Sequence, residues 1–336
     1  MKIFITGIAG LIGSNLATRL RQYEHHVIGC DTFIGGYKDN VPAYIVHNED
    51  IHNTAKLTTI LEEFKPDVVV HCAAFAYEGL SVFSPSLVVN NIVSGTLSVA
   101  TAAVQAKVRR FINCSSMARY GQGIPPFTED MMPNPVDPYG LGKVQAEQQL
   151  KLLSDIHGLE VITVVPHNVI GIGQRYTDPY RNVAAIMCNQ AINNKPIYIY
   201  GDGKQQRSFS DVRDCVKALI TLLSCSDNLN GKIYNIGPDE NEVTILELAQ
   251  LVKRLNGSKS TIIHLPDRPR EVKNAFCSSE LIKRDFNYQI TYNLEQTVGD
   301  LSEWMQNRKQ FKFEYHLPLE ITSSIDIPRT WTDKLF

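Results

Sequence analysis

The sequence lacks the features that mark several large classes of protein. Its seven cysteines include no Cys-x-x-Cys pair, which argues against a disulfide framework or a zinc site and favours reduced thiols in the cytoplasm. The formal net charge is −2 and there is no basic run, so neither nucleic acid nor an anionic membrane is expected as a partner. We expect no signal peptide and no segment long and apolar enough to cross a bilayer.

The chain has no internal repeat and no low-complexity linker, and its 336 residues are enough for a large core and two lobes. Apolar segments alternate with helical patterns in the first half, which is typical of a parallel sheet covered on both faces. The strands predicted there are residues 3–6, 27–30, 43–46, 68–71, 111–114 and 161–165. The predicted helices are residues 11–22, 54–64, 88–105 and 138–157.

After about residue 166 proline and glycine interrupt the pattern more often. Here we predict strands at 197–200, 232–236 and 261–264 and helices at 180–192, 211–223, 245–254, 279–286 and 294–305. The fold class is therefore α/β, a Rossmann-like doubly wound parallel sheet with a smaller mixed α/β lobe. Residues 1–165 form the predicted nucleotide-binding domain, with segments near 208–236 packing back on it. Residues 166–336 form the substrate lobe and a C-terminal tail, which we expect to pack down through Trp331 and Phe336.

Three glycines, Gly7, Gly10 and Gly13, follow the first predicted strand and lead into a helix. Glycine allows a tight turn and leaves no Cβ between the backbone and a pyrophosphate. The N–H groups at the helix start, at Leu11 and Ile12, attract negative charge. The spacing differs from the standard dinucleotide fingerprint, so the triplet alone also fits a plain strand–turn–helix unit.

An acidic residue, Asp31, follows the second predicted strand and supports the nucleotide interpretation. A carboxylate at this place accepts hydrogen bonds from the hydroxyls of an adenosine ribose, and it repels a 2′-phosphate. The expected cofactor is therefore NAD rather than NADP. Small residues, Ala73 and Ala74, follow the fourth strand and leave room for the nicotinamide ribose.

A serine, a tyrosine and a lysine are the candidate catalytic residues. Ser116 follows a strand, at the sheet edge where ligands bind in open α/β folds. Tyr139 and Lys143 are four residues apart on a helix, so both side chains lie on one face. A nearby ammonium and the positive nicotinamide would lower the phenol pKa from about 10 and make Tyr139 a general base. Each motif alone also fits a surface or turn position.

With these motifs in their expected order, the chain resembles the extended short-chain dehydrogenase/reductase family, particularly its UDP-galactose-type nucleotide-sugar 4-epimerases. The resemblance covers nearly the whole length. It implies further cofactor contacts at Asp50, Ile51, Asn91, Ser115 and Pro166, and also through Tyr139 and Lys143. It also implies a nucleotide-diphosphate sugar as substrate, bound by Ser116, Asn168, Arg181, Tyr200, Arg207 and Arg268, with no metal. The second arginine motif extends over residues 268–272.

Two side chains after Ser116 indicate which reaction of the family is expected. The resembling 4,6-dehydratases carry an acidic pair there, and the UDP-glucuronate decarboxylases a glutamate, whereas this chain has Met117 and Ala118. Neither side chain can exchange a proton, so the expected reaction is inversion at C4 through a transient 4-keto sugar. A nucleotide-sugar dehydrogenase or reductase, a dehydratase and a non-catalytic NAD-binding regulator remain as alternatives.

The identity of the sugar stays open between several nucleotide sugars. The first choices are UDP-glucose/UDP-galactose and UDP-N-acetylglucosamine/UDP-N-acetylgalactosamine, followed by dTDP-L-rhamnose or another deoxyhexose. Ala275 occupies the position of a bulky tyrosine in galactose-specific relatives, which predicts a larger sugar pocket. His167 is either a packed loop residue or a substrate contact. The resemblance also implies a homodimer formed through the helices at 88–105 and 138–157.

Overall fold

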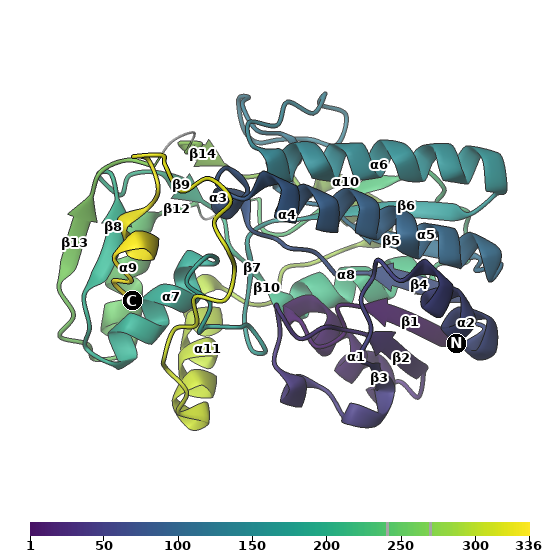
Figure 1. Cartoon of the computed structure of the whole chain (residues 1–336), viewed down its shortest axis with the longest axis horizontal. Coiled ribbons are helices and arrows are strands. Elements are labelled where there is room, and N and C mark those ends of the chain that lie inside the picture. The colour runs from purple at the N-terminus through teal and green to yellow at the C-terminus, as the bar shows by residue number, and fades with distance from the viewer. Residues whose placement is uncertain (240–241, 269–270) are drawn as a thin grey trace.

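A seven-stranded parallel sheet forms the centre of one lobe in the computed structural model, which describes residues 1–239, 242–268 and 271–336 (Figure 1). Its strand order is β11-β6-β5-β4-β1-β2-β3. The strands are β1 (Lys2–Thr6), β2 (His26–Cys30), β3 (Val46–His47), β4 (Val68–His71), β5 (Arg110–Cys114), β6 (Glu160–Pro166) and β11 (Ile233–Ile236). The order runs outward in both directions from β1 and β4, so the doubly wound α/β fold predicted from the sequence is confirmed.

Helices cover both faces of this sheet because successive strand residues point to opposite faces. Ile3 and Ile5 belong to one hydrophobic core and Phe4 to the other. The first core includes residues of α1 (Leu11–Gln22), α8 (Val212–Ser224) and α10 (Glu280–Phe286). The second includes residues of α2 (Thr54–Phe64), α5 (Gly95–Gln105) and α6 (Pro138–His157).

The helical run that ends in α5 corrects one expectation from the sequence. It begins with α4 (Pro85–Val89) and continues through a π-helical segment, Asn90–Ser94. By length and composition this run, Pro85–Gln105, is apolar enough to cross a membrane, with a mean hydropathy of 1.6. The structure packs it in the helical layer over the sheet, and half of the apolar window is buried. The expectation that no segment meets the length and composition test was therefore wrong.

The second lobe surrounds its own hydrophobic core, at the left of Figure 1. Three helices pack there: α7 (Val183–Ile192), α9 (Ile245–Leu255) and α11 (Leu294–Arg308). Small sheets complete this lobe. One pairs β8 (Ile197–Tyr200) with β13 (Ile262–Leu265), and another pairs β7 (Val169–Ile170) with β10 (Ser210–Asp211). In a third, β9 (Gln206–Arg207) lies between β12 (Val243–Thr244) and β14 (Asn274–Ala275). Between these segments α8, β11 and α10 return to the first lobe, so the two lobes interleave along the chain.

Most predicted elements agree with the observed ones to within one or two residues, and four differ more. The helical run predicted at 88–105 begins at Pro85, and the helix predicted at 294–305 extends to Arg308. Residues 43–46 do not form the predicted strand, because Ala43–Ile45 is a 3-10 turn and only Val46 and His47 pair with β2. The helix predicted from 180 begins at Val183, after the left-handed Asn182.

The last residues form a C-terminal strap (residues 314–336) that runs from the second lobe to the first and back. Glu320 accepts hydrogen bonds from Ser86 N (2.9 Å) and Leu87 N (2.8 Å) at the start of α4. Trp331, in α12 (Arg329–Thr332), donates from Nε1 to Pro179 O at 3.0 Å. The strap therefore packs on the body through Trp331, as the sequence predicted.

Candidate active site

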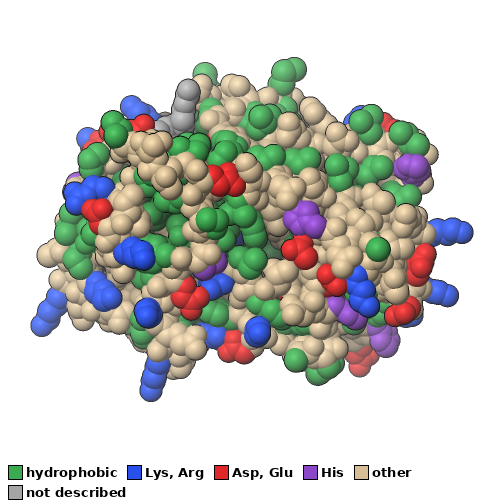
Figure 2. All heavy atoms as spheres, viewed as in Figure 1, with side chains coloured by type: hydrophobic (Ala, Val, Ile, Leu, Met, Phe, Trp, Pro, Cys, Tyr) green, Lys and Arg blue, Asp and Glu red, His purple; other side chains and the backbone are tan. Residues whose placement is uncertain are grey.

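A cavity of about 490 Å³ lies where the carboxyl ends of the sheet strands meet the second lobe. Every cofactor, catalytic and substrate residue predicted from the sequence lines it. Figure 2 shows apolar side chains gathered around a hollow near the middle of one face of the molecule. Parallel strands bring residues that are distant in sequence to one edge, and the sequence predictions therefore converge on one site.

The glycine loop between β1 and α1 is shaped to hold a pyrophosphate. Gly7 has φ +66°, and a Cβ there would lie 2.8 Å from Ala73 N. A Cβ on Gly13 would lie 2.2 Å from Gly7 O, so both positions require glycine. Gly10 is the N-cap of α1, and no side chain caps that helix. The first-turn N–H groups at Leu11 and Ile12 therefore face the cavity, where a phosphate would accept from them.

Asp31 closes this loop at the end of β2. Its Oδ2 accepts from Ala9 N at 2.8 Å and its Oδ1 from Phe33 N at 2.6 Å. Burial raises the pKa of the carboxyl, and these backbone N–H groups partly oppose that rise. Asp50 and Ile51 line the same end of the cavity. This arrangement matches the ribose site of a dinucleotide, so the residues present fit NAD.

The middle of the cavity is lined by the segments that follow β4, β5 and β6. Ala73 and Ala74 follow β4, and Asn91 Oδ1 accepts from Phe75 N at 2.7 Å and holds this loop. Ser115 also lines the cavity, but its hydroxyl hydrogen-bonds the Glu147 carboxylate. Pro166 ends β6 beside them.

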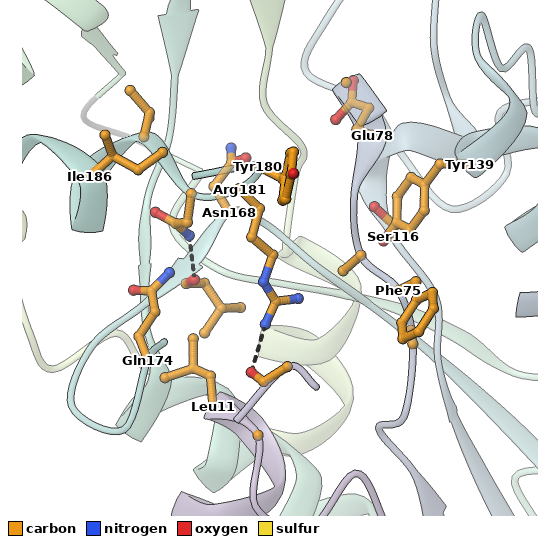
Figure 3. Close-up of a pocket in the computed structure, with 18 of the residues that line it drawn as sticks. Leu11, Phe75, Glu78, Ser116, Tyr139, Asn168, Gln174, Tyr180, Arg181 and Ile186 are labelled. Atoms are coloured by element: carbon orange, nitrogen blue, oxygen red, sulfur yellow. Dashed lines mark hydrogen bonds between the residues drawn. The ribbon is translucent and has the colours of Figure 1, made fainter. Parts of the chain in front are cut away.

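The three predicted catalytic residues come together at the start of α6. Figure 3 shows Ser116 and Tyr139 on the same side of the cavity. Tyr139 lies in the first turn of α6, whose N-cap Asp137 accepts from Gly140 N at 2.8 Å. Lys143 Nζ lies 5.9 Å from the centroid of the Tyr139 ring and donates to Cys114 O at 2.8 Å.

The pKa shifts of Tyr139 and Lys143 differ from those predicted from the sequence. Burial raises the pKa of the Tyr139 phenol, while a hydrogen bond with Ser116 lowers it. The pKa of Lys143 is lowered, also chiefly by burial. Lys143 is not among the main contributions to the tyrosine pKa, because its ammonium is directed to a backbone carbonyl, while the lowering by a nicotinamide ring stays a prediction.

Two guanidinium groups meet at the substrate end of the cavity. Glu271 Oε1 lies 2.9 Å from Arg268 Nη2 and 3.8 Å from Arg207 Nη2. The Arg268 guanidinium also stacks 4.9 Å from the centroid of the Tyr200 ring. Paired guanidiniums are well suited to a diphosphate because their donors match phosphate oxygens. Pro269 and Arg270, within the predicted second arginine motif, lie outside the described residues.

Asn168 and Arg181 line the wall opposite Tyr139 (Figure 3). Asn168 has φ +31° and donates from Nδ2 to Ser208 O at 2.9 Å. Arg181 donates to Gly35 O at 3.3 Å, so its guanidinium faces the loop that follows Asp31.

The positions of Ala275 and His167 decide two further predictions from the sequence. Ala275 lies in β14 against the hydrophobic cluster of Met117 and Tyr120 and does not line the cavity, so it does not enlarge the sugar pocket. His167 is fully buried and also absent from the lining, so it is the packed loop residue. Burial lowers the pKa of His167 to about 4.

Several cavity residues were not predicted from the sequence. Glu78 and Asp137 place two carboxyl groups near Tyr139, and the strap adds Pro328, Thr330, Trp331 and Phe336. Asp137 precedes the tyrosine motif by two residues and could have been found as its helix cap. No periodicity or motif identifies the strap residues. Within the described part of the chain, no group of three His, Cys, Asp or Glu side chains could hold a metal ion.

The comparisons with known proteins agree with this geometry. A family model described as the NAD dependent epimerase/dehydratase family matches residues 3–237. The UDP-glucose 4-epimerase of Mycolicibacterium smegmatis is 29% identical over 322 residues, covering 92% of this chain and 100% of the relative. A UDP-N-acetyl-alpha-D-glucosaminuronate decarboxylase of Bacillus cytotoxicus is 32% identical over 325 residues, covering 91% and 98%.

Among solved structures, the UDP-glucuronic acid 4-epimerase of Bacillus cereus, in complex with UDP-glucuronic acid and NAD, matches with a TM-score of 0.84 and 27% identity. The match covers 92% of this chain and 100% of that one. The chain is thus similar to proteins that transform nucleotide sugars in more than one way.

Proposed function

The chain belongs to the NAD-dependent epimerase/dehydratase family, and we propose that it inverts C4 of a nucleotide-diphosphate hexose. UDP-glucose/UDP-galactose and UDP-N-acetylglucosamine/UDP-N-acetylgalactosamine are the first choices of substrate, and dTDP-L-rhamnose or another deoxyhexose comes next. The support for C4 chemistry is that Tyr139 and Ser116 meet in the same cavity that the cofactor loop and the paired arginines line.

NAD is the cofactor of this protein, as it is of the family. The residues that would hold it are the glycine loop at Gly7, Gly10 and Gly13, with Asp31 at the ribose. When bound, it supplies the hydride acceptor for C4 and a positive ring charge near the phenol.

The chain's own residues carry the proton of the reaction. The Ser116 hydroxyl lies beside the phenol, lowers its pKa and is placed to bind the C4 oxygen of the sugar as well. Tyr139 removes the proton from that hydroxyl while the C4 hydrogen leaves as hydride. In the reverse half the same phenol returns the proton as the hydride adds to the opposite face of C4. Proton and hydride are both restored, so the reaction is an isomerisation without net oxidation.

The two side chains directly after Ser116 favour epimerisation over the other reactions of the family. Met117 and Ala118 are buried, and neither side chain can remove a C5 proton. Elimination of water therefore lacks the acid–base pair that the resembling dehydratases carry at these two positions. Arg207 and Arg268, together with Asn168, are the proposed diphosphate contacts.

A substrate deuterated at C4 tests this function directly. We expect UDP-glucose labelled at C4 to give UDP-galactose of unchanged mass that keeps the deuterium at C4. A net dehydrogenase would move the label into the free cofactor pool, and a dehydratase product would be lighter by one water. Either result would contradict the proposal, as would the absence of turnover that a non-catalytic NAD-binding regulator would show.

A further inference from the structure

The side chain of Glu78 lies in the cavity beside the catalytic residues. Figure 3 shows it on the same side as Tyr139 and Ser116. Glu78 begins the short helix α3 (Glu78–Ser81), and Ser81 ties this helix to α6. Ser81 Oγ donates to Glu78 O at 2.7 Å and accepts from Tyr139 N at 3.2 Å. The element that bears Glu78 is therefore fixed to the first turn of the helix that bears the phenol.

The C-terminal strap holds α3 from its other side. Phe83, just after α3, packs edge-on against Trp331 with 6.1 Å between the ring centroids. A Cβ on Gly79 would lie 3.7 Å from the Trp331 ring, in ordinary contact. Because α3 is packed between α6 and the strap, Glu78 keeps its place in the cavity.

Two other carboxyl groups, Asp137 and Glu271, lie close enough for their charges to interact with Glu78. Asp137 and Glu271 line the same cavity. Burial, together with the charge of Glu78, raises the pKa of Asp137 to about 7. An additional anion at this end of the cavity would therefore meet two acidic side chains beside the phenol.

The positive charges near Glu78 are engaged elsewhere. Desolvation raises the pKa of Glu78 overall, although the charges of Arg207 and Arg268 lower it. Both guanidiniums are held on Glu271 and are the proposed diphosphate contacts. Arg181 is directed to Gly35 O on the cofactor side. Within the described ranges, no side chain forms an ion pair or hydrogen bond with the Glu78 carboxylate.

We propose that Glu78 restricts the substrate to a neutral sugar, because its carboxylate accepts a hydrogen bond from a sugar hydroxyl or amide N–H and repels a C6 carboxylate. The inference rests on the proposed epimerase function and names its substrate class as neutral nucleotide-diphosphate hexoses. It separates this chain from similar proteins that act on uronic acids.

The test compares neutral and acidic nucleotide sugars with the purified holoenzyme. kcat/KM is measured for UDP-glucose, UDP-N-acetylglucosamine and UDP-glucuronate with the native chain, Glu78→Gln and Glu303→Gln. Glu303 is exposed on α11, so this control removes the same charge far from the cavity. The native chain is expected to favour a neutral sugar, and Glu78→Gln to shift the ratio toward UDP-glucuronate by about tenfold or more. The control leaves the ratio unchanged.

Competition binding of the same nucleotide sugars, without turnover, gives a second measurement on the same variants. Faster epimerisation of UDP-glucuronate than of every neutral sugar by the native chain would overturn this inference and leave the proposed function standing. An unchanged ratio of affinities in Glu78→Gln would also overturn it. Failure of every sugar to react would instead contradict the proposed function. The ratio of binding affinities would still show whether Glu78 disfavours the acidic sugar.

Discussion

Tyr139 lies buried beside Ser116, and burial raises the pKa of its phenol. A neutral phenol is a poor base, so we expect the epimerisation rate to increase with pH as the phenolate forms. Tyr139→Phe should lower kcat by about 10²- to 10⁴-fold, because the phenol supplies general base catalysis. Bound NAD, measured by its absorbance after denaturation, should stay unchanged. A variant that keeps its rate, or keeps the same pH profile, would show that another group removes the proton.

At this scale the sequence could predict residues that belong to local patterns. Gly7, Gly13 and the Tyr139/Lys143 pair follow from spacing within one strand–turn–helix or one helix. The direction of the pKa shifts could not be predicted, because burial depends on the packing of distant segments around α6. Glu78 was missed for the same reason, since its place beside Tyr139 comes from the fold of the loop after β4.

Among the elements, the C-terminal strap contributes a wall that the family's central sheet does not supply. Trp331 is 7% exposed and packs between Phe83 and Tyr180. Trp331→Ala should destabilise the protein by roughly 3–5 kcal/mol, as expected for a buried aromatic side chain. It should also raise KM for the nucleotide sugar more than it lowers kcat.

Urea unfolding and steady-state kinetics measure both effects. Ile325→Ala is the matched control, because Ile325 lies in the same strap and is 98% exposed. Equal effects from the two substitutions would contradict the role assigned to the strap.

The end of α8 shows how one buried charge joins elements of the sheet layer. Arg110 is fully buried in β5 and donates to Leu222 O (2.8 Å) and Cys225 O (2.7 Å) at the end of α8. It also pairs with Glu160 at 2.8 Å. Arg110→Met should cost about 3–5 kcal/mol at pH 7, because it leaves buried acceptors and a carboxylate without their partner.

The pH dependence of that loss follows from Glu160. Burial raises the pKa of the Glu160 carboxyl. Hydrogen bonds from Arg110 and Leu229 N, together with the charges of Arg110 and Arg109, lower this pKa by more than burial raises it. The pKa in the folded state therefore lies below the ordinary 4.5. Because the pKa of Glu160 is lower in the folded than in the unfolded state, ionised Glu160 stabilises the fold at pH values above its unfolded-state pKa. This stabilisation is lost as the pH falls through the folded-state pKa. The difference between native chain and Arg110→Met should therefore shrink below pH 4.5. A difference that stays constant in acid would exclude the ion pair as its source.

Elements with a clear period were predictable and the others were not. α1, α2 and α6 have the bounds predicted from the sequence, since apolar spacing marks all three and cap residues mark α2 and α6. The strand predicted at 43–46 was wrong because most of its apolar residues precede the edge strand, which is only two residues long. The path of the strap depends on contacts more than 200 residues apart in sequence, such as Ser86 with Glu320, and local patterns contain no information on them.

For the whole molecule, we predict a homodimer formed through the helical layer over the sheet. α6 exposes Leu141, Leu152 and Ile156, at 48%, 55% and 72%. Their spacing places them on one face of the helix, and the neighbouring run Pro85–Gln105 leaves half of its apolar window unburied. Size-exclusion chromatography with light scattering should give a dimer mass, and Leu152→Glu with Ile156→Glu should give a monomer. A monomeric native chain would contradict this arrangement.

The interleaving of the lobes is a property of the whole chain. The alternating pattern of the first half predicted a parallel sheet, but β11, which lies beyond the second lobe's first helix, completes its edge. This return, together with α8 and α10, joins the two lobes, although none of these three elements contributes a residue to the cavity lining. Pattern alone could suggest that residues near 208–236 return, whereas the strand order required the structure.

The chemistry proposed for this cavity is an exchange of configuration at C4 without net oxidation. An NMR time course on purified protein, with no added cofactor, tests it against UDP-glucose, UDP-N-acetylglucosamine, UDP-glucuronate and dTDP-L-rhamnose. We expect a neutral sugar to convert to an equilibrium mixture with its C4 epimer while no NADH accumulates. Accumulation of NADH or of a keto sugar, seen only when NAD⁺ is supplied, would contradict the proposed epimerisation and identify a dehydrogenase.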